Sequence, residues 1–114
     1  MNILEEYANY FNKQVGRKFP YSNQIVTCIY ITKDKQKVLN YLNKNNIIPM
    51  QNAERYMKWQ EENEYWIWRP ISENIRGLRF YKVKISKDYN DYKALREIII
   101  PCCNLYCCSW EVVQ

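Results

Sequence analysis

Residues 25–31, Ile-Val-Thr-Cys-Ile-Tyr-Ile, constrain the fold more than any other part of this chain. Six of these seven side chains are apolar, counting Tyr30. A strand with one face in water alternates apolar and polar side chains, whereas a strand covered on both faces is apolar throughout. We therefore expect residues 25–31 to form a central strand, with Cys28 in the core.

The rest of the chain predicts a small α+β domain. Helical spacing of apolar residues predicts helices at 2–15 capped by Asn2, at 33–45 capped by Thr32, at 52–62 capped by Asn52, and after Asn90 until Pro101 stops it. Extended patterns predict strands at 65–69, 78–85 and 105–113, with a short extended piece at 47–49. The length of 114 residues suits one domain. We expect a single domain over 1–114, with a four- or five-stranded mixed sheet and three to four helices packed on it.

Positive charge gathers in residues 65–87, which have the pattern of a strand, a turn and a second strand. This stretch holds a single acid, Glu73, and six cations: Arg69, Arg76, Arg79, Lys82, Lys84 and Lys87. Its net charge of +5 equals that of the whole chain, so the remaining charges cancel. A ligand with negative charge would therefore be expected here.

Alternation along the second strand of this hairpin assigns its side chains to two faces. Phe80, Lys82 and Lys84 share one face, which we expect to be exposed. The other face contains Arg79 at the rim and three side chains expected in the core, Tyr81, Val83 and Ile85.

The hairpin is the candidate binding site. Its cations suit phosphates, and Trp66, Trp68 and Phe80 offer rings for stacking with unpaired bases. The same residue types also anchor protein interfaces. A third interpretation makes the tryptophans core side chains beneath a solvated charged face. The candidate residues are Trp66, Trp68, Arg69, Arg76, Arg79, Phe80, Lys82 and Lys84.

Two absences exclude several kinds of catalysis. The chain has no His, which excludes Ser–His and Cys–His nucleophile pairs and His-based metal sites. Its two glycines, Gly16 and Gly77, are too far apart for a Walker A loop or a dinucleotide fingerprint.

A metal-dependent nuclease would need an acid two residues before a strand lysine, where this chain has Lys82-Val83-Lys84. We expect no enzymatic activity, no cofactor and no metal; a nuclease using Glu73 or Asp88 is the second alternative.

Four cysteines lie within seven residues, at 102, 103, 107 and 108. A zinc site normally takes its ligands from two separate pairs, and neighbours on an extended chain point to opposite faces. A Cys103–Cys107 disulfide would fit a turn, but not a reducing compartment. We expect buried small side chains here, with one or two exposed thiols.

Composition suggests where such a protein works. No apolar run approaches the roughly 20 residues of a membrane span, and the N-terminus does not resemble a secretory signal, so we expect a cytoplasmic protein. Abundant Asn, Ile, Lys and Tyr are typical of a low-GC bacterium, its phages or its mobile elements. The sequence predicts a non-enzymatic protein that binds nucleic acid or a nucleoprotein. The alternative is a phage-type inhibitor of a host protein, such as a CRISPR-type defence nuclease.

Overall fold

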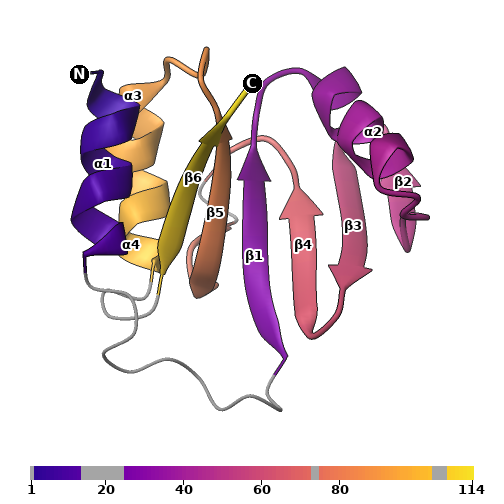
Figure 1. Ribbon diagram of the computed structural model, residues 1–114. Helices are drawn as coiled ribbons and strands as arrows, with labels where there is room; N and C mark the ends of the chain where they lie inside the picture. The colour runs from indigo at the N-terminus through magenta and orange to yellow at the C-terminus, as the bar shows by residue number, and fades with distance from the viewer. Residues whose placement is uncertain (1, 14–24, 73–74, 104–107) are drawn as a thin grey trace.

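Six strands form one mixed sheet, in the order β2-β3-β4-β1-β5-β6 (Figure 1). The computed structural model describes residues 2–13, 25–72, 75–103 and 108–114. Its strands are β1 (Val26–Ile31), β2 (Gln51–Ala53), β3 (Tyr56–Glu61), β4 (Glu64–Trp68), β5 (Phe80–Ser86) and β6 (Ser109–Val113). Its helices are α1 (Ile3–Asn12), α2 (Lys35–Lys44) and a continuous third helix that joins α3 (Tyr92–Ala94), a π-helical turn (Leu95–Ile99) and α4 (Ile100–Cys102). The α+β class and the mixed sheet are confirmed, but the sheet has more strands than the predicted four or five.

Strand β1 lies inside the sheet, as its apolar sequence predicts. It pairs in parallel with β4 on one side and with β5 on the other. Its neighbouring residues Cys28 and Ile29 are both fully buried, in the cores on opposite faces of the sheet. Figure 1 shows α2 on one side of the sheet and α1, α3 and α4 on the other, so β1 is covered twice.

Each face of the sheet has its own apolar core. The core beneath α2 is rich in aromatic side chains and contains Trp59, Trp66 and Trp68. The rings of Trp59 and Trp66 stack with their centroids 6.2 Å apart. The core beneath α1 and the third helix contains Trp110, which stacks on Phe11 at 5.2 Å between centroids. All four tryptophans of the chain are therefore structural.

Side chains cap the first two helices. The Oδ1 atom of Asn2 accepts a hydrogen bond from the backbone N–H of Glu5 at 2.9 Å, as predicted for α1. The predicted cap of α2 is wrong, because Asp34 rather than Thr32 accepts from the N–H of Gln36, at 2.9 Å. Thr32 instead accepts from the N–H of Asp34 at 3.1 Å, which places the true cap two residues later.

Pro101 does not stop the third helix as predicted, since that helix continues to Cys102. The turn before it is π-helical, with the N–H of Ile100 bonded to the carbonyl of Leu95. A proline has no N–H to donate and is tolerated in the first turn of a helix. The wide turn therefore ends at Ile99, and Pro101 lies in the first turn of α4, which begins at Ile100. None of the described helices is long and apolar enough to cross a membrane.

The helix predicted at 52–62 is wrong. This segment forms the antiparallel strands β2 and β3 instead, and adds the strands that the prediction lacked. Met57 and Trp59 point into the core beneath α2, while Lys58 and Gln60 point to the other side. This alternation has the period of a strand, and it outweighs the helical spacing of Ala53, Tyr56 and Met57.

The hairpin predicted over residues 65–87 is also wrong. Strands β4 and β5 do not pair with each other, because β1 lies between them and is parallel to both. Parallel strands require a crossover rather than a tight turn. The described part of the connecting segment crosses the face beneath α1, where Ile75 is fully buried.

An irregularity in β5 changes the predicted faces of its first residues. Thr27 of β1 aligns with Phe80, but the next residue, Cys28, aligns with Lys82, so one residue of β5 is extra. Phe80 is consequently fully buried beneath α1 rather than exposed beside Lys82, and Tyr81 packs against the other core. The predicted burial of the later residues Val83 and Ile85 is confirmed.

At Trp110, the outer edge of β6 is covered by a side chain of α1. The amide nitrogen of Asn12 donates to the backbone carbonyl of Trp110 at 2.9 Å. Its amide oxygen accepts from the Trp110 N–H at 2.8 Å. Asn12 thus bonds to both backbone groups as a neighbouring strand would.

Candidate functional site

The three aromatic side chains predicted for base stacking are buried. Trp66 and Trp68 are 2% and 6% exposed beneath α2, and Phe80 is fully buried on the other face. The indole N–H of Trp68 donates to the carbonyl of Thr32 at 2.8 Å, and that of Trp66 to the carboxylate of Glu64 at 3.1 Å. These rings therefore offer no stacking surface in this structure.

Two of the predicted cations, Lys82 and Lys84, bind groups of the protein itself. Lys82 forms an ion pair with Glu64. Burial acts to lower the pKa of Lys82, but the hydrogen bond and charge of Glu64 outweigh it and raise that pKa. The ammonium of Lys84 donates to the hydroxyl of Tyr41 at 2.8 Å and lies 4.9 Å from the ring centroid of Trp66.

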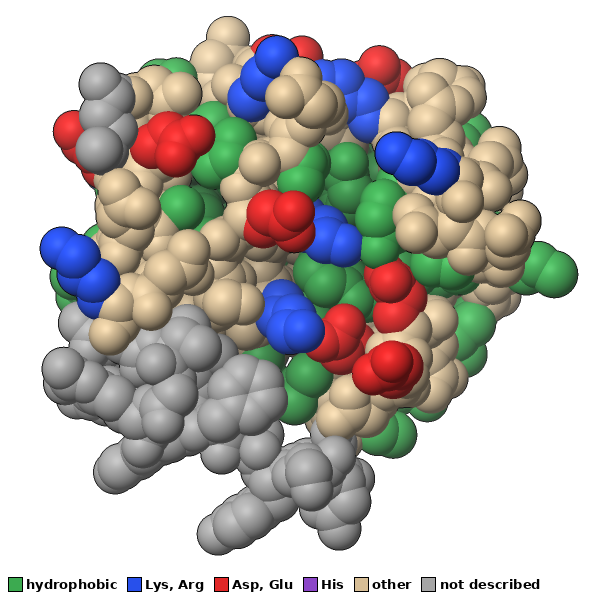
Figure 2. Space-filling view, viewed as in Figure 1, with side chains coloured by type: hydrophobic (Ala, Val, Ile, Leu, Met, Phe, Trp, Pro, Cys, Tyr) green, Lys and Arg blue, Asp and Glu red, His purple; other side chains and the backbone are tan. Residues whose placement is uncertain are grey.

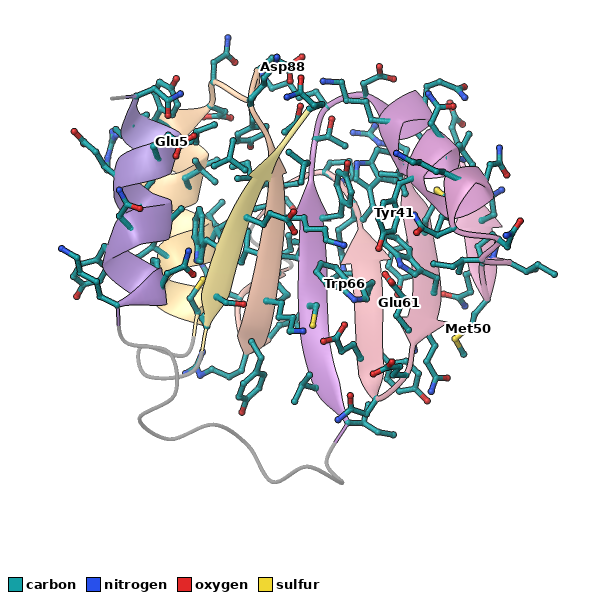
Figure 3. The ribbon with its side chains drawn as sticks, viewed as in Figure 1. Glu5, Tyr41, Met50, Glu61, Trp66 and Asp88 are labelled. Carbon is teal, nitrogen blue, oxygen red and sulfur yellow. The ribbon has the colours of Figure 1, made fainter. Side chains whose placement is uncertain are left out.

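A hydrogen-bonded chain continues from Lys84 to Glu61. Tyr41 accepts from Lys84 and donates its own proton to the Glu61 carboxylate at 2.8 Å. The indole N–H of Trp59 donates to the same carboxylate at 3.0 Å. Burial raises the pKa of Tyr41 above its ordinary value, and the bond to Glu61 raises it further. Figure 3 shows Tyr41, Glu61 and Trp66 gathered beside α2.

The predicted site is therefore not a single surface. Figure 2 shows acidic and basic side chains intermixed with apolar ones across the face that carries α2. The three arginines of the prediction lie outside the strands β4 and β5: Arg69 directly follows β4, and Arg76 and Arg79 lie in the segment before β5. Arg76 and Arg79 are exposed, and Arg69 is half-buried.

A different group of basic and aromatic side chains gathers on the opposite face, over β3 and β4. We call it the tyrosine face, and it consists of Arg55, Tyr56, Lys58, Tyr65 and Arg69. The pairing of Met57 with Trp68 places Tyr56 beside Arg69, and Tyr65 lies opposite Gln60. Among the described residues of this face, Tyr56, Lys58, Tyr65 and Arg69 are half-buried and Arg55 is exposed. The described helices on this side bury β5 and β6 more completely than β3 and β4.

Each tyrosine ring of this face has a cation beside it. The ammonium of Lys58 lies 4.9 Å from the ring centroid of Tyr65, and the guanidinium of Arg69 lies 5.9 Å from that of Tyr56. A hollow of about 240 Å³ lies between them, with Ile67 and Leu78 as its apolar floor and side. A second hollow of about 410 Å³ continues past Tyr56 and Arg69 to Arg55, Pro70 and Ser72. No described residue lining either hollow is acidic.

Four of these five side chains were missed by sequence reasoning; only Arg69 was among the predicted residues. The missed signal is the alternation of Tyr56 and Lys58 with the buried Met57 and Trp59. A strand of this kind presents a basic aromatic face when its other face is apolar. The erroneous helix at 52–62 concealed that pattern.

The described cysteines, Cys28, Cys102, Cys103 and Cys108, are buried free thiols. Burial raises the pKa of Cys28 to about 12. The pKa of Cys108 is raised by a hydrogen bond with Cys103 and by burial. Cys107, and with it the Cys103–Cys107 pairing, lies outside the described residues. The part of the chain that the structure describes contains no group of three or more Cys, Asp or Glu placed to hold a metal ion.

Comparisons of the whole chain with models of protein families, with curated proteins and with solved structures found no match.

Proposed function

We propose that this protein binds single-stranded nucleic acid on the tyrosine face, without catalysis. One observation carries the proposal: two half-buried tyrosine rings on an open side of the sheet, each accompanied by a cation, in hollows whose described lining is free of acids. Aromatic rings on a sheet surface stack with unpaired bases, and neighbouring cations bind the phosphates between them.

The spacing of the two rings suits separate bases. Tyr65 lies opposite Gln60, four residues along β3 from Tyr56. At about 3.3 Å per residue the rings are roughly 13 Å apart along the strand. Lys58 lies between these two positions, where it can reach a phosphate that links stacked bases. Stacking of this kind tolerates any base, so we expect little sequence preference.

Binding should depend on both the rings and the cations. We expect Tyr65→Ala to weaken binding by about 1–3 kcal/mol, because one stacked base is lost. We expect the logarithm of the association constant to fall linearly with the logarithm of salt concentration, with a slope of about −2. Three contacted phosphates contribute about −0.7 each. The measurement is fluorescence anisotropy with labelled single-stranded DNA and RNA, between about 50 and about 200 mM salt.

The matched control is Lys44→Ala, on the exposed last turn of α2 and outside the tyrosine face. It should bind like the unaltered protein. The proposal fails if neither DNA nor RNA binds at about 50 mM salt, or if Tyr65→Ala and Lys44→Ala have the same affinity.

A protein partner remains the second candidate, and one observation favours it. The apolar side chains of Ile48 and Met50 are 88% and 54% exposed just before the edge strand β2. The backbone N–H of Met50 donates to the carbonyl of Lys58 at 2.7 Å, but neither Ile48 nor Met50 lines the hollows of the tyrosine face. Ile48→Asp with Met50→Asp should therefore abolish capture of a host protein and leave binding of nucleic acid intact. Capture that survives nuclease treatment and both substitutions would refute this candidate surface.

A further inference from the structure

A third hollow, of about 310 Å³, lies at the carboxyl ends of β1 and β4. Its volume is at the lower end of the range of about 300–1,000 Å³ found for small-ligand sites. It also lies at the carboxyl ends of parallel strands, a position that ligands favour. The neighbouring strands β1 and β5 are followed by α2 on one face and by α3 on the other, and ligands commonly bind where the connections diverge in this way.

This hollow continues directly from the tyrosine face. Arg55, Arg69 and Pro70 line both it and the 410 Å³ hollow beside Tyr56. Tyr56 and Arg69 in turn line the hollow over β3 and β4. The three hollows therefore form a path from the middle of the sheet to its carboxyl edge, with Arg69 along its whole length.

Three cations converge on the hollow at the edge: Lys33, Arg55 and Arg69. Among the described residues, no carboxylate lies within ion-pair distance of any of them. The ammonium of Lys33 donates to a neutral group, the amide oxygen of Asn90, at 3.3 Å. A phosphate at the end of a strand carries about −1.5 to −2 charges at neutral pH, more than an internal phosphate. Three cations that have no ion-pair partner among the described residues match such a group better than they match one internal phosphate.

The walls of this hollow suit the rest of a nucleotide. Pro70 and Ile71 give one apolar wall, and the ring of Tyr89 contributes another. The side chain of Asp91, which also lines the hollow, can accept a hydrogen bond from a sugar hydroxyl.

Beyond Lys33, acidic side chains line the surface instead of basic ones. The adjoining hollow shares Lys33 and Tyr89 but is also lined by Asp34 and Asp88. A hydrogen bond from Ser86 and an ion pair with Lys37 lower the pKa of Asp88, so this carboxylate stays charged. A chain of phosphates that continued past Lys33 would meet these acids. The path therefore suits the end of a strand and not its middle.

We infer that the hollow formed by Lys33, Arg55, Arg69 and Tyr89 holds the terminal nucleotide, with its end phosphate, of a strand bound on the tyrosine face. The inference rests on the proposed function, because the strand reaches the hollow from that face. It assigns the protein a ligand class, single strands that end in a phosphate.

The test compares three oligonucleotides of one sequence, with a 5′-phosphate, with a 3′-phosphate and with neither, each as DNA and as RNA. We expect a phosphate at one of the two ends to tighten binding by about tenfold, which corresponds to about 1.4 kcal/mol. The three affinities are measured by competition against the labelled unmodified strand.

Two variants connect this preference to its site. In Lys33→Ala the ratio between the affinities for phosphorylated and unmodified strands should fall toward one. In Lys58→Ala both affinities should fall together, so that the ratio is kept. Equal binding of the three strands overturns the inference, as does a ratio that Lys33→Ala does not change. The proposed function survives either result if binding still depends on Tyr65.

Discussion

The hydroxyl of Tyr41 connects two side chains of opposite charge on the face beneath α2. It accepts from the Lys84 ammonium and donates to the Glu61 carboxylate, both at 2.8 Å. Both charges are half-buried, and a partly buried polar group that loses its partner carries a cost in free energy. Lys84, which was predicted to hold a ligand, therefore contributes to stability through this chain.

Removing that hydroxyl should destabilise the protein. We expect Tyr41→Phe to lower the free energy of unfolding by about 1–3 kcal/mol, because Lys84 and Glu61 each lose a hydrogen bond while the ring stays in place. Urea denaturation measures the difference. The control is Tyr10→Phe, whose ring is 52% exposed on α1 and should change stability by less than about 0.5 kcal/mol. Equal urea midpoints for the two variants would show that the chain has no stabilising role.

At the scale of elements, α2 acts as the cover of the tryptophan core. Val38 and Leu42 are the fully or almost fully buried side chains by which α2 packs on this core. Trp59 and Trp66 lie stacked beneath them in the same cluster. The fluorescence of these two tryptophans should therefore depend on how α2 packs over them.

A smaller side chain on α2 should loosen this core. We expect Leu42→Ala to lower the free energy of unfolding by about 2–5 kcal/mol, because it leaves a cavity under the helix. Tryptophan emission should shift to longer wavelength as water reaches the indoles. Leu39→Ala, on the half-buried side of the same helix, should cost less and leave the emission unchanged. A smaller effect of Leu42→Ala than of Leu39→Ala would contradict this packing.

The elements differ in how much of them the sequence could predict. β1 was predictable because burial on both faces leaves a continuous apolar run, and α1 because Asn2 caps a clear apolar stripe. β3 was not, because Tyr56 and Met57 fit a helical stripe as well as a strand. The alternation of Met57 and Trp59 with Lys58 favours the strand, and tertiary packing, which places Met57 and Trp59 in one core, decides between the two interpretations.

The candidate site was predictable in composition but not in place. The sequence located a basic aromatic region, and Arg69 does belong to the tyrosine face. Local alternation could not reveal that β1 separates β4 from β5, since strand order depends on contacts between distant residues. Nor could it reveal the irregularity that turns Phe80 into the core. For Trp66 and Trp68 the sequence leaves a binding surface and the core as alternatives, because alternation does not tell which face of a strand is buried.

At the scale of the whole molecule, the pKa values of the side chains predict how stability depends on pH. The chain has no His, so no side chain of ordinary pKa titrates between about pH 5 and 8. Burial raises the pKa of Cys28 and of Tyr89, each to about 12, and of Tyr30. These groups are held neutral in the folded state and ionise more readily when the chain unfolds.

Stability should accordingly be flat near neutral pH and fall in alkali. A group whose pKa is raised by folding gives its full contribution below its unfolded pKa, here 9.0 for Cys28 and 10.0 for Tyr89. That contribution is lost as the pH rises toward about 12. We expect the free energy of unfolding to be constant between about pH 6 and 8 and to decrease above about pH 9. Chemical denaturation with a reductant present measures it, and an increase in stability above pH 9 would refute the assignment.

The carboxamide of Asn12 also decides how copies of this molecule could join. A sheet with two open edges can add molecules at both ends, and repeated addition gives a fibre. Here Asn12 already occupies the backbone of Trp110 at the outer edge of β6, whereas β2 forms the edge at the other end. Pairing through β2 would join two copies around a two-fold axis. At the other end of the sheet, a strand added beside Trp110 would have to displace Asn12, so the fold favours edge-to-edge pairing at β2 over pairing at β6.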